Sequence, residues 1–320
     1  MSTPDAFLSD VVAEPETLAG LLDAYGGLES PLDALGEVGE RRLVFVGMGS
    51  SRFAALAAAC RLRAAGLDAH VEYASTRTLP PAGAGTLVVA ISSSGATPET
   101  VEAAARLRGA GRLVAITNRP GAPLGEVADV VLPLLAGEEE GGIACRTYQA
   151  TVAVLLLLCG RILGEPGAAR LRPAVPAVAA LIGSREEWLA PALEILGGGP
   201  LDVVGPVERL SSAEQSALML REAPRIRAVA CETGDWLHVD LYLTRPSGYR
   251  ALLLPGSRFD AGFCEWIERR GCAFVSVGQV VPGASFQVGY PGAEDELVAL
   301  LAETTAVELL AAGLWRRQHA

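Results

Sequence analysis

The sequence predicts an α/β fold in which two parallel sheets, each covered by helices on both faces, follow one another in tandem. Short β-branched runs, beginning with LVFVG at residues 43–47, alternate with helical patterns, and this alternation is typical of a parallel sheet between helices. The strand, loop, helix, arginine-rich helix end, glycine and strand of residues 86–118 recur in the same order in residues 249–278. This internal repeat indicates two copies of one α/β unit.

The same patterns divide the chain into four segments. Residues 1–40 are expected to be helical with a polar face, and residues 41–165 to form the first subdomain. Proline and glycine concentrate in LGEPGAARLRPAVPAV, so residues 166–196 are expected to be a linker with a helix. Residues 197–320 form the second predicted subdomain, which a helix from about Glu294 to Arg317 closes.

The charge and cysteine content narrow the classes of ligand and location. The 320 residues carry a net charge of -11 and no lysine, which disfavours a nucleic-acid surface and excludes Schiff-base chemistry at a lysine. An anionic ligand must therefore be held locally. The six cysteines form no CxxC pair, and the N-terminus lacks a basic and then apolar signal pattern, so we expect a cytoplasmic protein. The longest apolar run, TVAVLLLLC, is shorter than the roughly 20 residues that span a bilayer, and we expect a buried helix there.

Two serine-rich turns follow predicted strands of the first subdomain. In GMGSSRF, Gly49 permits a tight turn, and Ser50 or Ser51 is expected to cap the helix that follows. In AISSSGATPET, Thr97 is the expected N-cap, followed by a proline in the first helical position. The hydroxyls of Ser92–Ser94 and the free N–H groups at the helix start could hold a phosphate without lysine. The alternative is that these serines only cap helices and end strands.

The second subdomain carries PGSRFDAG in the position of SSSGATPE, with one serine and one arginine. We interpret it as a degenerate copy that does not bind phosphate. Arg258 is then an ordinary surface charge.

Two side chains in the second half can transfer protons. Glu222 is expected to end a helix that Pro224 stops, and a carboxylate at a helix C-terminus has its pKa raised towards that of a useful general base. Ser211 or Ser212 is expected to start that helix as part of a capping box. His238 can give and take a proton near neutral pH. The alternatives are a solvated glutamate at a helix end and a structural histidine.

These residues resemble the sugar isomerase (SIS) domain family, and within it the isomerase half of glucosamine-6-phosphate synthase. The resemblance runs through GMGSS, ISSSGATPET and GEEEGGIACRTYQATVAVLLLLCGRI, and continues from GPVERLSSAEQSALMLRE to TGDWLHVD. It implies two SIS subdomains in tandem, with flavodoxin-like topology. It also implies that Glu222 moves a proton between C1 and C2 of the sugar, and that His238 opens the sugar ring from the neighbouring subunit of a homodimer. The residues implied to bind the sugar phosphate, or to line the sugar through their backbone, are Gly49, Ser50, Ser51, Ser92, Ser93, Ser94, Thr97, Ile143 and Ala144.

Three departures from the family bear on the substrate. The chain lacks the family's N-terminal glutaminase domain, so we expect it not to release ammonia from glutamine by itself. The family's C-terminal tail and its catalytic lysine have no counterpart after LWRRQHA, although Arg316, Arg317 or His319 could reach a site. Four positions around the sugar also differ from the family, namely Ser93, Ala96, Arg146 and Thr147.

The sequence therefore predicts an enzyme, an aldose-ketose isomerase of a phosphosugar or amino sugar phosphate, that acts through an enediol-type intermediate without a cofactor or metal. One alternative is an amino-sugar-phosphate deaminase or deglycase, or an ammonia-adding synthase with a separate glutaminase. Another is a non-catalytic phosphosugar sensor. A nucleotide-binding protein is disfavoured because neither common glycine-rich nucleotide motif follows the first strand.

Overall fold

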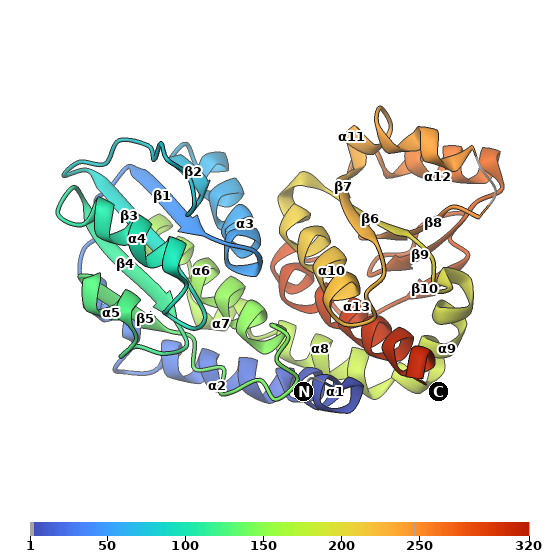
Figure 1. Cartoon of the computed structure of the whole chain (residues 1–320), viewed down its shortest axis with the longest axis horizontal. Helices are drawn as coiled ribbons and strands as arrows, with labels where there is room; N and C mark the ends of the chain where they lie inside the picture. Colours follow the sequence, from blue (N-terminus) through green and yellow to red (C-terminus); the bar gives the residue numbers. More distant parts are fainter. Residues whose placement is uncertain (1–2, 246–247, 320) are drawn as a thin grey trace. The chain divides into compact units, whose positions relative to one another are not determined.

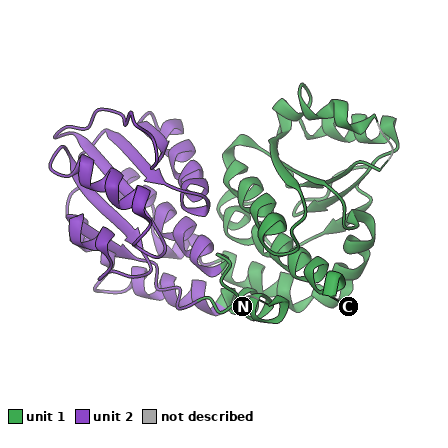
Figure 2. Ribbon diagram, viewed as in Figure 1, with its two compact units in different colours: residues 1–15, 139–145, 173–320 green, residues 16–138, 146–172 purple. Residues whose placement is uncertain are grey.

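The computed structural model of the chain describes residues 3–245 and 248–319. The chain forms two compact units (Figure 2). Their residues are 1–15, 139–145 and 173–320 for unit 1, and 16–138 and 146–172 for unit 2. Each unit is built around one five-stranded sheet. The bounds of the four segments expected from the sequence stay a prediction.

The sheet of unit 2 is entirely parallel, in the order β2-β1-β3-β4-β5 (Figure 1). Its strands are β1 (Arg42–Gly47), β2 (Asp68–Tyr73), β3 (Thr86–Ile91), β4 (Arg112–Thr117) and β5 (Val130–Pro133). The central strand β3 is buried along its whole length, because helices cover both faces and its TLVVAI sequence is apolar at nearly every position.

The helices of unit 2 cover both faces of this sheet. They are α2 (Glu14–Gly26), α3 (Ser50–Ala64), α4 (Pro98–Leu107), α5 (Pro123–Val127), α6 (Arg146–Leu163) and α7 (Ala168–Leu171), with a 3-10 turn η1 (Pro31–Leu35). Helix α3 packs on β1, β2 and α6, whereas α4 packs on β3, β1 and α5. The chain leaves β1 in one direction along the sheet and β3 in the other, so right-handed crossovers place α3 and α4 on opposite faces.

The sheet of unit 1 repeats that topology. It is parallel, in the order β10-β9-β8-β6-β7, and its strands are β6 (Leu201–Gly205), β7 (Ala228–Glu232), β8 (Arg250–Leu253), β9 (Ala273–Val277) and β10 (Phe286–Val288). Numbered from its own first strand, each sheet has the order 2-1-3-4-5 of the flavodoxin-like class. The predicted tandem α/β fold is therefore confirmed.

The helices of unit 1 form the outer layers of the second sheet. They are α1 (Pro4–Val12), α8 (Ala174–Gly183), α9 (Arg185–Leu196), α10 (Leu210–Glu222), α11 (Thr233–Trp236), α12 (Asp260–Arg270) and α13 (Glu296–His319), with 3-10 turns η2 (Val207–Arg209) and η3 (Asp240–Thr244). Helix α13 packs along α10, α8, α9 and α1, and is drawn in red in Figure 1.

Two helices, α6 and α13, are long and apolar enough to cross a membrane by length and composition alone. Their most apolar windows are 78% and 100% buried within the protein. Such burial is typical of core helices in a soluble protein, and it confirms the expectation of a buried helix around TVAVLLLLC.

Two helix starts differ from the prediction. Gly49, not a serine, is the N-cap of α3, because the turn after β1 needs a left-handed residue, and Gly49 has a φ of 50°. No side chain caps this helix, and Ser50 is its first residue. Helix α10 begins at Leu210, directly after η2, so Ser211 and Ser212 lie buried in its first turn and form no capping box.

Candidate functional site

The two serine-rich loops of unit 2 follow neighbouring strands. β1 and β3 are adjacent and parallel, so residues 47–51 and 92–97 leave the sheet at the same edge. They are close enough that a Cβ on Gly47 would lie 3.3 Å from the carbonyl oxygen of Ile91. The strand order reverses between β1 and β3, and this is the point at which open α/β sheets bind ligands.

The hydroxyls of the triple-serine loop form one group. The Oγ of Ser92 lies 2.9 Å from the Oγ1 of Thr97 and 3.4 Å from the Oγ of Ser94. Thr97 is the N-cap of α4 and Pro98 follows it, as predicted. Its side chain makes no capping hydrogen bond, so the start of α4 keeps N–H groups that no cap occupies.

The backbone of this loop is fixed by the end of β4. The carbonyl of Ser93 accepts hydrogen bonds from the backbone N–H of Asn118 at 3.0 Å and from the Oγ1 of Thr117 at 3.2 Å. Gly95 has a φ of 65°, and a Cβ there would lie 2.6 Å from the Cβ of Ala122 and 2.8 Å from the Oγ1 of Thr117. Only glycine fits this turn without displacing its neighbours.

Arg52 is a cation at this edge of the sheet that sequence reasoning missed. It lies in the first turn of α3, and its guanidinium carbon is 4.3 Å from the ring centroid of Tyr73, at the end of β2. Its buried Nε has no hydrogen-bond partner among the described residues. The arginine was visible in GMGSSRF, but only the pairing of β1 with β2 shows that Tyr73 holds it beside the loops.

Unit 1 contains a cavity of about 1000 Å³ beside Glu222. Its lining residues come from three segments, and they are Gly142, Ile143, Arg221, Glu222, Arg225, Trp315, Gln318 and His319. Glu222 is the last residue of α10, as the proline two positions later predicts. The structure thus brings Glu222 and Ile143 together, although they are far apart in the sequence.

The environment of Glu222 favours its protonated form. The side chain as a whole is exposed, but partial removal of its carboxyl from water raises its pKa. The guanidinium of Arg221 lowers that pKa, and the carboxylate of Glu139 raises it. The net direction is upwards, as a general base that works near neutral pH requires.

The segment that carries Ile143 is held tightly within unit 1. The carbonyl of Ala144 accepts a hydrogen bond from the Nε2 of Gln215 at 2.8 Å, and the backbone N–H of Gly141 donates to Asp10 at 2.6 Å. A Cβ on Gly141 would lie 2.6 Å from the Cα of Phe7. This segment therefore offers a fixed backbone to the cavity.

His238 is exposed on a different part of unit 1, after α11. Its backbone N–H donates to the carbonyl of Asp235 at 2.9 Å, and it does not line the Glu222 cavity. The residues beside it are apolar and also exposed: Val239 is 56%, Tyr242 63% and Leu243 55% exposed. Within the described chain, the structure does not bring His238 and Glu222 into one site.

The loop after β8 is the counterpart in unit 1 of the triple-serine loop. The carboxylate of Asp260, the first residue of α12, accepts hydrogen bonds from the backbone N–H groups of Gly256 at 2.7 Å and Ser257 at 3.1 Å. Arg258, expected as a surface charge, lies over the ring of Phe259 at 4.6 Å and lines a cavity of about 830 Å³. Arg209 lines the same cavity and donates hydrogen bonds to the carbonyl of Pro255 and the carboxylate of Glu303.

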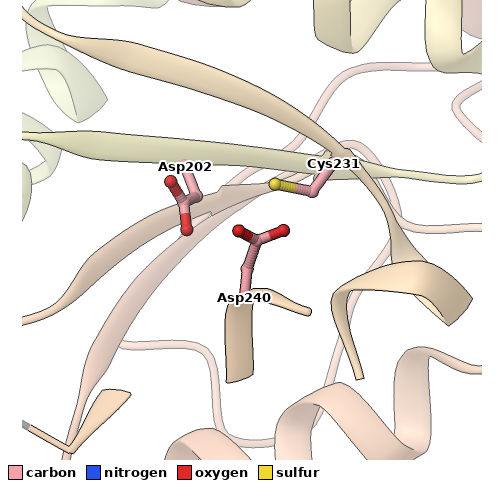
Figure 3. Close-up of side chains that lie close together, drawn as sticks. All are labelled: Asp202, Cys231 and Asp240. Carbon is pink, nitrogen blue, oxygen red and sulfur yellow. The ribbon is translucent and has the colours of Figure 1, made fainter. Parts of the chain in front are cut away.

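Figure 3 shows a group of metal-ligating residue types in unit 1, Asp202, Cys231 and Asp240, whose side chains approach one another from β6, β7 and η3. Their ligating atoms lie within 4.8 Å of one another. An oxygen of Asp202 already accepts a 2.6 Å hydrogen bond from Tyr249, which in turn accepts one from Trp236. Burial raises the pKa of Asp202 and of the Cys231 thiol, which disfavours the ionised forms that bind a metal.

The fold and the two serine loops define a class: a parallel α/β protein with hydroxyl-lined loops at the topological switch point of unit 2, where open sheets of this kind bind ligands. Comparison with known proteins places the chain within that class. The model of the SIS domain matches residues 38–160. The chain belongs to the SIS domain family.

Two curated relatives are clear. The chain is 32% identical over 272 residues to glutamine-fructose-6-phosphate aminotransferase [isomerizing] of Aeropyrum pernix, covering 79% of this chain and 44% of the relative. It is 34% identical over 114 residues to 3-hexulose-6-phosphate isomerase of Mycobacterium gastri, covering 35% of this chain and 56% of the relative. The matched regions thus cover about half the length of each relative.

A solved structure shows the same fold over the whole chain. The C-terminal domain of glucosamine-fructose-6-phosphate aminotransferase from Francisella tularensis superposes with a TM-score of 0.85 at 18% identity. The match covers 98% of this chain and 99% of that one. The likeness to that isomerase half, expected from the sequence, is confirmed at the level of fold.

Proposed function

We infer that this protein is an aldose-ketose isomerase of a phosphosugar or amino sugar phosphate, with Glu222 as the general base. The observation that carries the proposal is the position of Glu222 in the wall of a cavity, with a raised pKa, in a chain of the SIS family. In the reaction, Glu222 takes a proton from one carbon of the open-chain sugar and returns it to the neighbouring carbon. A placed base of this kind accelerates proton transfer typically by about 10²–10⁴-fold.

In this proposal the serine loops of unit 2 anchor the phosphate. Two features support the assignment: the grouped hydroxyls of the triple-serine loop, and the uncapped N–H groups at the starts of α3 and α4. Arg52 adds a positive charge at the same edge. The phosphate-binding residues proposed are Gly49, Ser50, Ser51, Ser92, Ser93, Ser94 and Thr97, while the backbone of Ile143 and Ala144 lines the sugar.

We also propose that the protein acts in the cytoplasm as a homodimer, in which His238 opens the sugar ring in the partner's site. Support comes from the exposure of His238 and from the apolar, exposed Val239, Tyr242 and Leu243 beside it. His238→Gln and Glu222→Gln chains, each inactive alone, should regain about a quarter of wild-type activity when mixed, since half of the dimers are mixed and each holds one intact site. No recovery in dimers that exchange subunits would contradict the shared site.

The direct test of the function uses exchange of the sugar C2 proton with solvent. The protein is incubated with hexose and amino-hexose 6-phosphates in deuterated water, and NMR follows deuterium at C2. We expect exchange in the wild type and a loss of about 10²–10⁴-fold in Glu222→Gln. The matched control is Glu214→Gln, the same substitution on α10 but outside the cavity, which should retain exchange.

The same samples separate the alternatives. Ammonia release from an amino sugar phosphate would identify a deaminase, and incorporation of added ammonia a synthase that depends on a separate glutaminase. Thermal stabilisation by a sugar phosphate without any exchange at C2 would overturn the isomerase proposal in favour of a phosphosugar sensor.

A further inference from the structure

We propose that His319 is a second catalytic residue of the Glu222 cavity, which transfers the proton between the two sugar oxygens while Glu222 transfers the proton between the two carbons. This inference rests on the isomerase function proposed above. Its starting point is that His319, the last described residue of α13, lines the same cavity as Glu222, the last residue of α10.

The hydrogen bonding of His319 leaves one ring nitrogen for a ligand. Its Nδ1 lies 3.0 Å from the carbonyl oxygen of Trp315, and a carbonyl can only accept, so Nδ1 carries the hydrogen. The bond persists whether the ring is neutral or charged. Nε2 is therefore the nitrogen left for a ligand, and it has no hydrogen-bond partner among the described residues.

Contacts at the ends of α10 and α13 hold His319 near the turn that follows Glu222. The Nε2 of Gln318 donates a 2.7 Å hydrogen bond to the carbonyl of Pro224, in the turn that follows Glu222. This bond ties the end of α13 to the end of α10. The ring of Trp315 packs against the rings of His319 and Phe7, with centroids 6.4 Å apart in each pair.

The turn that follows Glu222 holds backbone strain. Arg225 lines the cavity with a φ of 56°, a conformation that costs a residue other than glycine about 1–3 kcal/mol. Strain of this kind persists where surrounding structure enforces it, and it concentrates at functional sites. The strained turn, the cavity and the two titratable side chains thus coincide.

An aldose-ketose isomerisation needs both proton transfers, and the two residues balance them. Glu222 removes the C2 proton, the C2–H electron pair forms the C1=C2 bond, and O1 takes a proton from Nε2–H of the His319 imidazolium. The product is a neutral enediol and a neutral imidazole. Nε2 then accepts the proton of the O2 hydroxyl as Glu222 returns its proton to C1, which forms the ketose and regenerates both residues.

The test compares His319→Gln and His319→Ala with His70→Gln. His70 is a matched control because it lies on β2 of unit 2 and its Nε2 is 2.7 Å from the carboxylate of Asp68. With a sugar phosphate that the wild type isomerises, both His319 variants should lose kcat by about 100-fold or more, with KM changed by about threefold or less. His70→Gln should keep the wild-type values, and the thermal midpoints of the His319 variants should match the wild type.

Free imidazole separates a chemical role from a structural one. Added to His319→Ala, it should enter the emptied corner of the cavity and restore kcat by about tenfold, because a diffusible acid-base group replaces the lost one. Added to Glu222→Gln, it should restore nothing. A wild-type kcat in His319→Gln, or no response of His319→Ala to imidazole, would overturn the role of His319 alone. A wild type that exchanges no C2 proton with any sugar phosphate would overturn the isomerase function, and this role with it.

Discussion

The loops that follow β3 and β8 occupy the same place in two sheets of the same topology, but they present opposite groups to a ligand. Helix α4 starts with Pro98 behind an N-cap that makes no capping bond, and the hydroxyls of Ser92, Ser94 and Thr97 form one group in the loop before it. Helix α12 starts with Asp260, whose carboxylate already accepts from Gly256 and Ser257. An anion at the second loop would therefore meet a resident negative charge.

The difference shows that topology supplies the location of a ligand site, while one side chain at a helix start decides whether an anion can use it. It also gives a physical basis for interpreting PGSRFDAG as a degenerate copy, which stays a prediction. The arginines near the two loops also differ between the units. Arg209 in unit 1 is buried and bonded to Glu303, whereas Arg52 in unit 2 stacks on Tyr73 and pairs with no carboxylate among the residues that the structure describes.

The largest expected effect comes from replacing each of these two arginines by methionine. Arg209→Met leaves the fully buried Glu303 without its cation, and should lower the free energy of unfolding by about 3–5 kcal/mol. Arg52→Met loses a partly exposed cation-π contact worth about 0.5–1 kcal/mol. It should instead weaken sugar phosphate binding by about tenfold or more, through one lost charge-assisted bond. Urea unfolding and calorimetric titration measure the two effects, and equal destabilisation by both variants would remove the distinction.

A second test concerns the turn of the triple-serine loop. Gly95→Ala adds a Cβ that meets Ala122 and Thr117 and forces a left-handed alanine, so it should destabilise the protein by about 2–4 kcal/mol and abolish sugar phosphate binding. Gly109→Ala is the control, since Gly109 has a φ of 77° but open space around its added Cβ. It should cost about 1 kcal/mol and leave binding intact.

A smaller effect is expected when the resident carboxylate of unit 1 is removed. Asp260→Ser gives up two hydrogen bonds to backbone N–H groups, at a cost of about 1–2 kcal/mol, and exposes those groups to solvent. We expect a second, weak site for inorganic phosphate in calorimetric titrations. Asp260→Ala, which lacks the hydroxyl, tests whether the N–H groups suffice. If neither variant gains phosphate binding, the carboxylate is not what separates the two loops.

The smallest expected effect is a difference in pH dependence between the sheets. Burial raises the pKa of Asp202 in unit 1, so the folded protein holds a proton that the unfolded chain releases, and stability falls as pH rises above about 4. Hydrogen bonding to Arg42 lowers the pKa of Asp68 in unit 2, so its contribution is present above about pH 4 and is lost as pH falls. The thermal midpoint of the wild type minus that of the variant, measured from pH 3 to 7, should therefore fall with rising pH for Asp202→Asn and increase with rising pH for Asp68→Asn.

Local sequence rules predicted much of the fold and part of the site. Alternating β-branched and helical runs predicted two parallel sheets, Thr97 and Pro98 predicted the start of α4, and Pro224 predicted where α10 ends. Each of these depends on residues adjacent in the chain.

Features that depend on contacts between distant segments could not be predicted. Arg52 reaches Tyr73 only because β1 pairs with β2, and His319 reaches the Glu222 cavity only because α13 packs along α10. The start of α3 was also predicted wrongly. Glycine and serine are both common N-cap residues, and the left-handed turn after β1 favours Gly49.

The polar side chains buried along α13 set the helical register of this long and largely apolar helix. Arg209 bonds Glu303 of α13, and Thr305 donates a 2.6 Å hydrogen bond to Glu14. A slip of α13 by one residue along its axis would rotate the helix by about 100° and move it by about 1.5 Å. These buried polar groups would then lose their partners. These contacts therefore allow only one register of α13. The same register places His319 in the wall of the cavity, about four turns further along the helix.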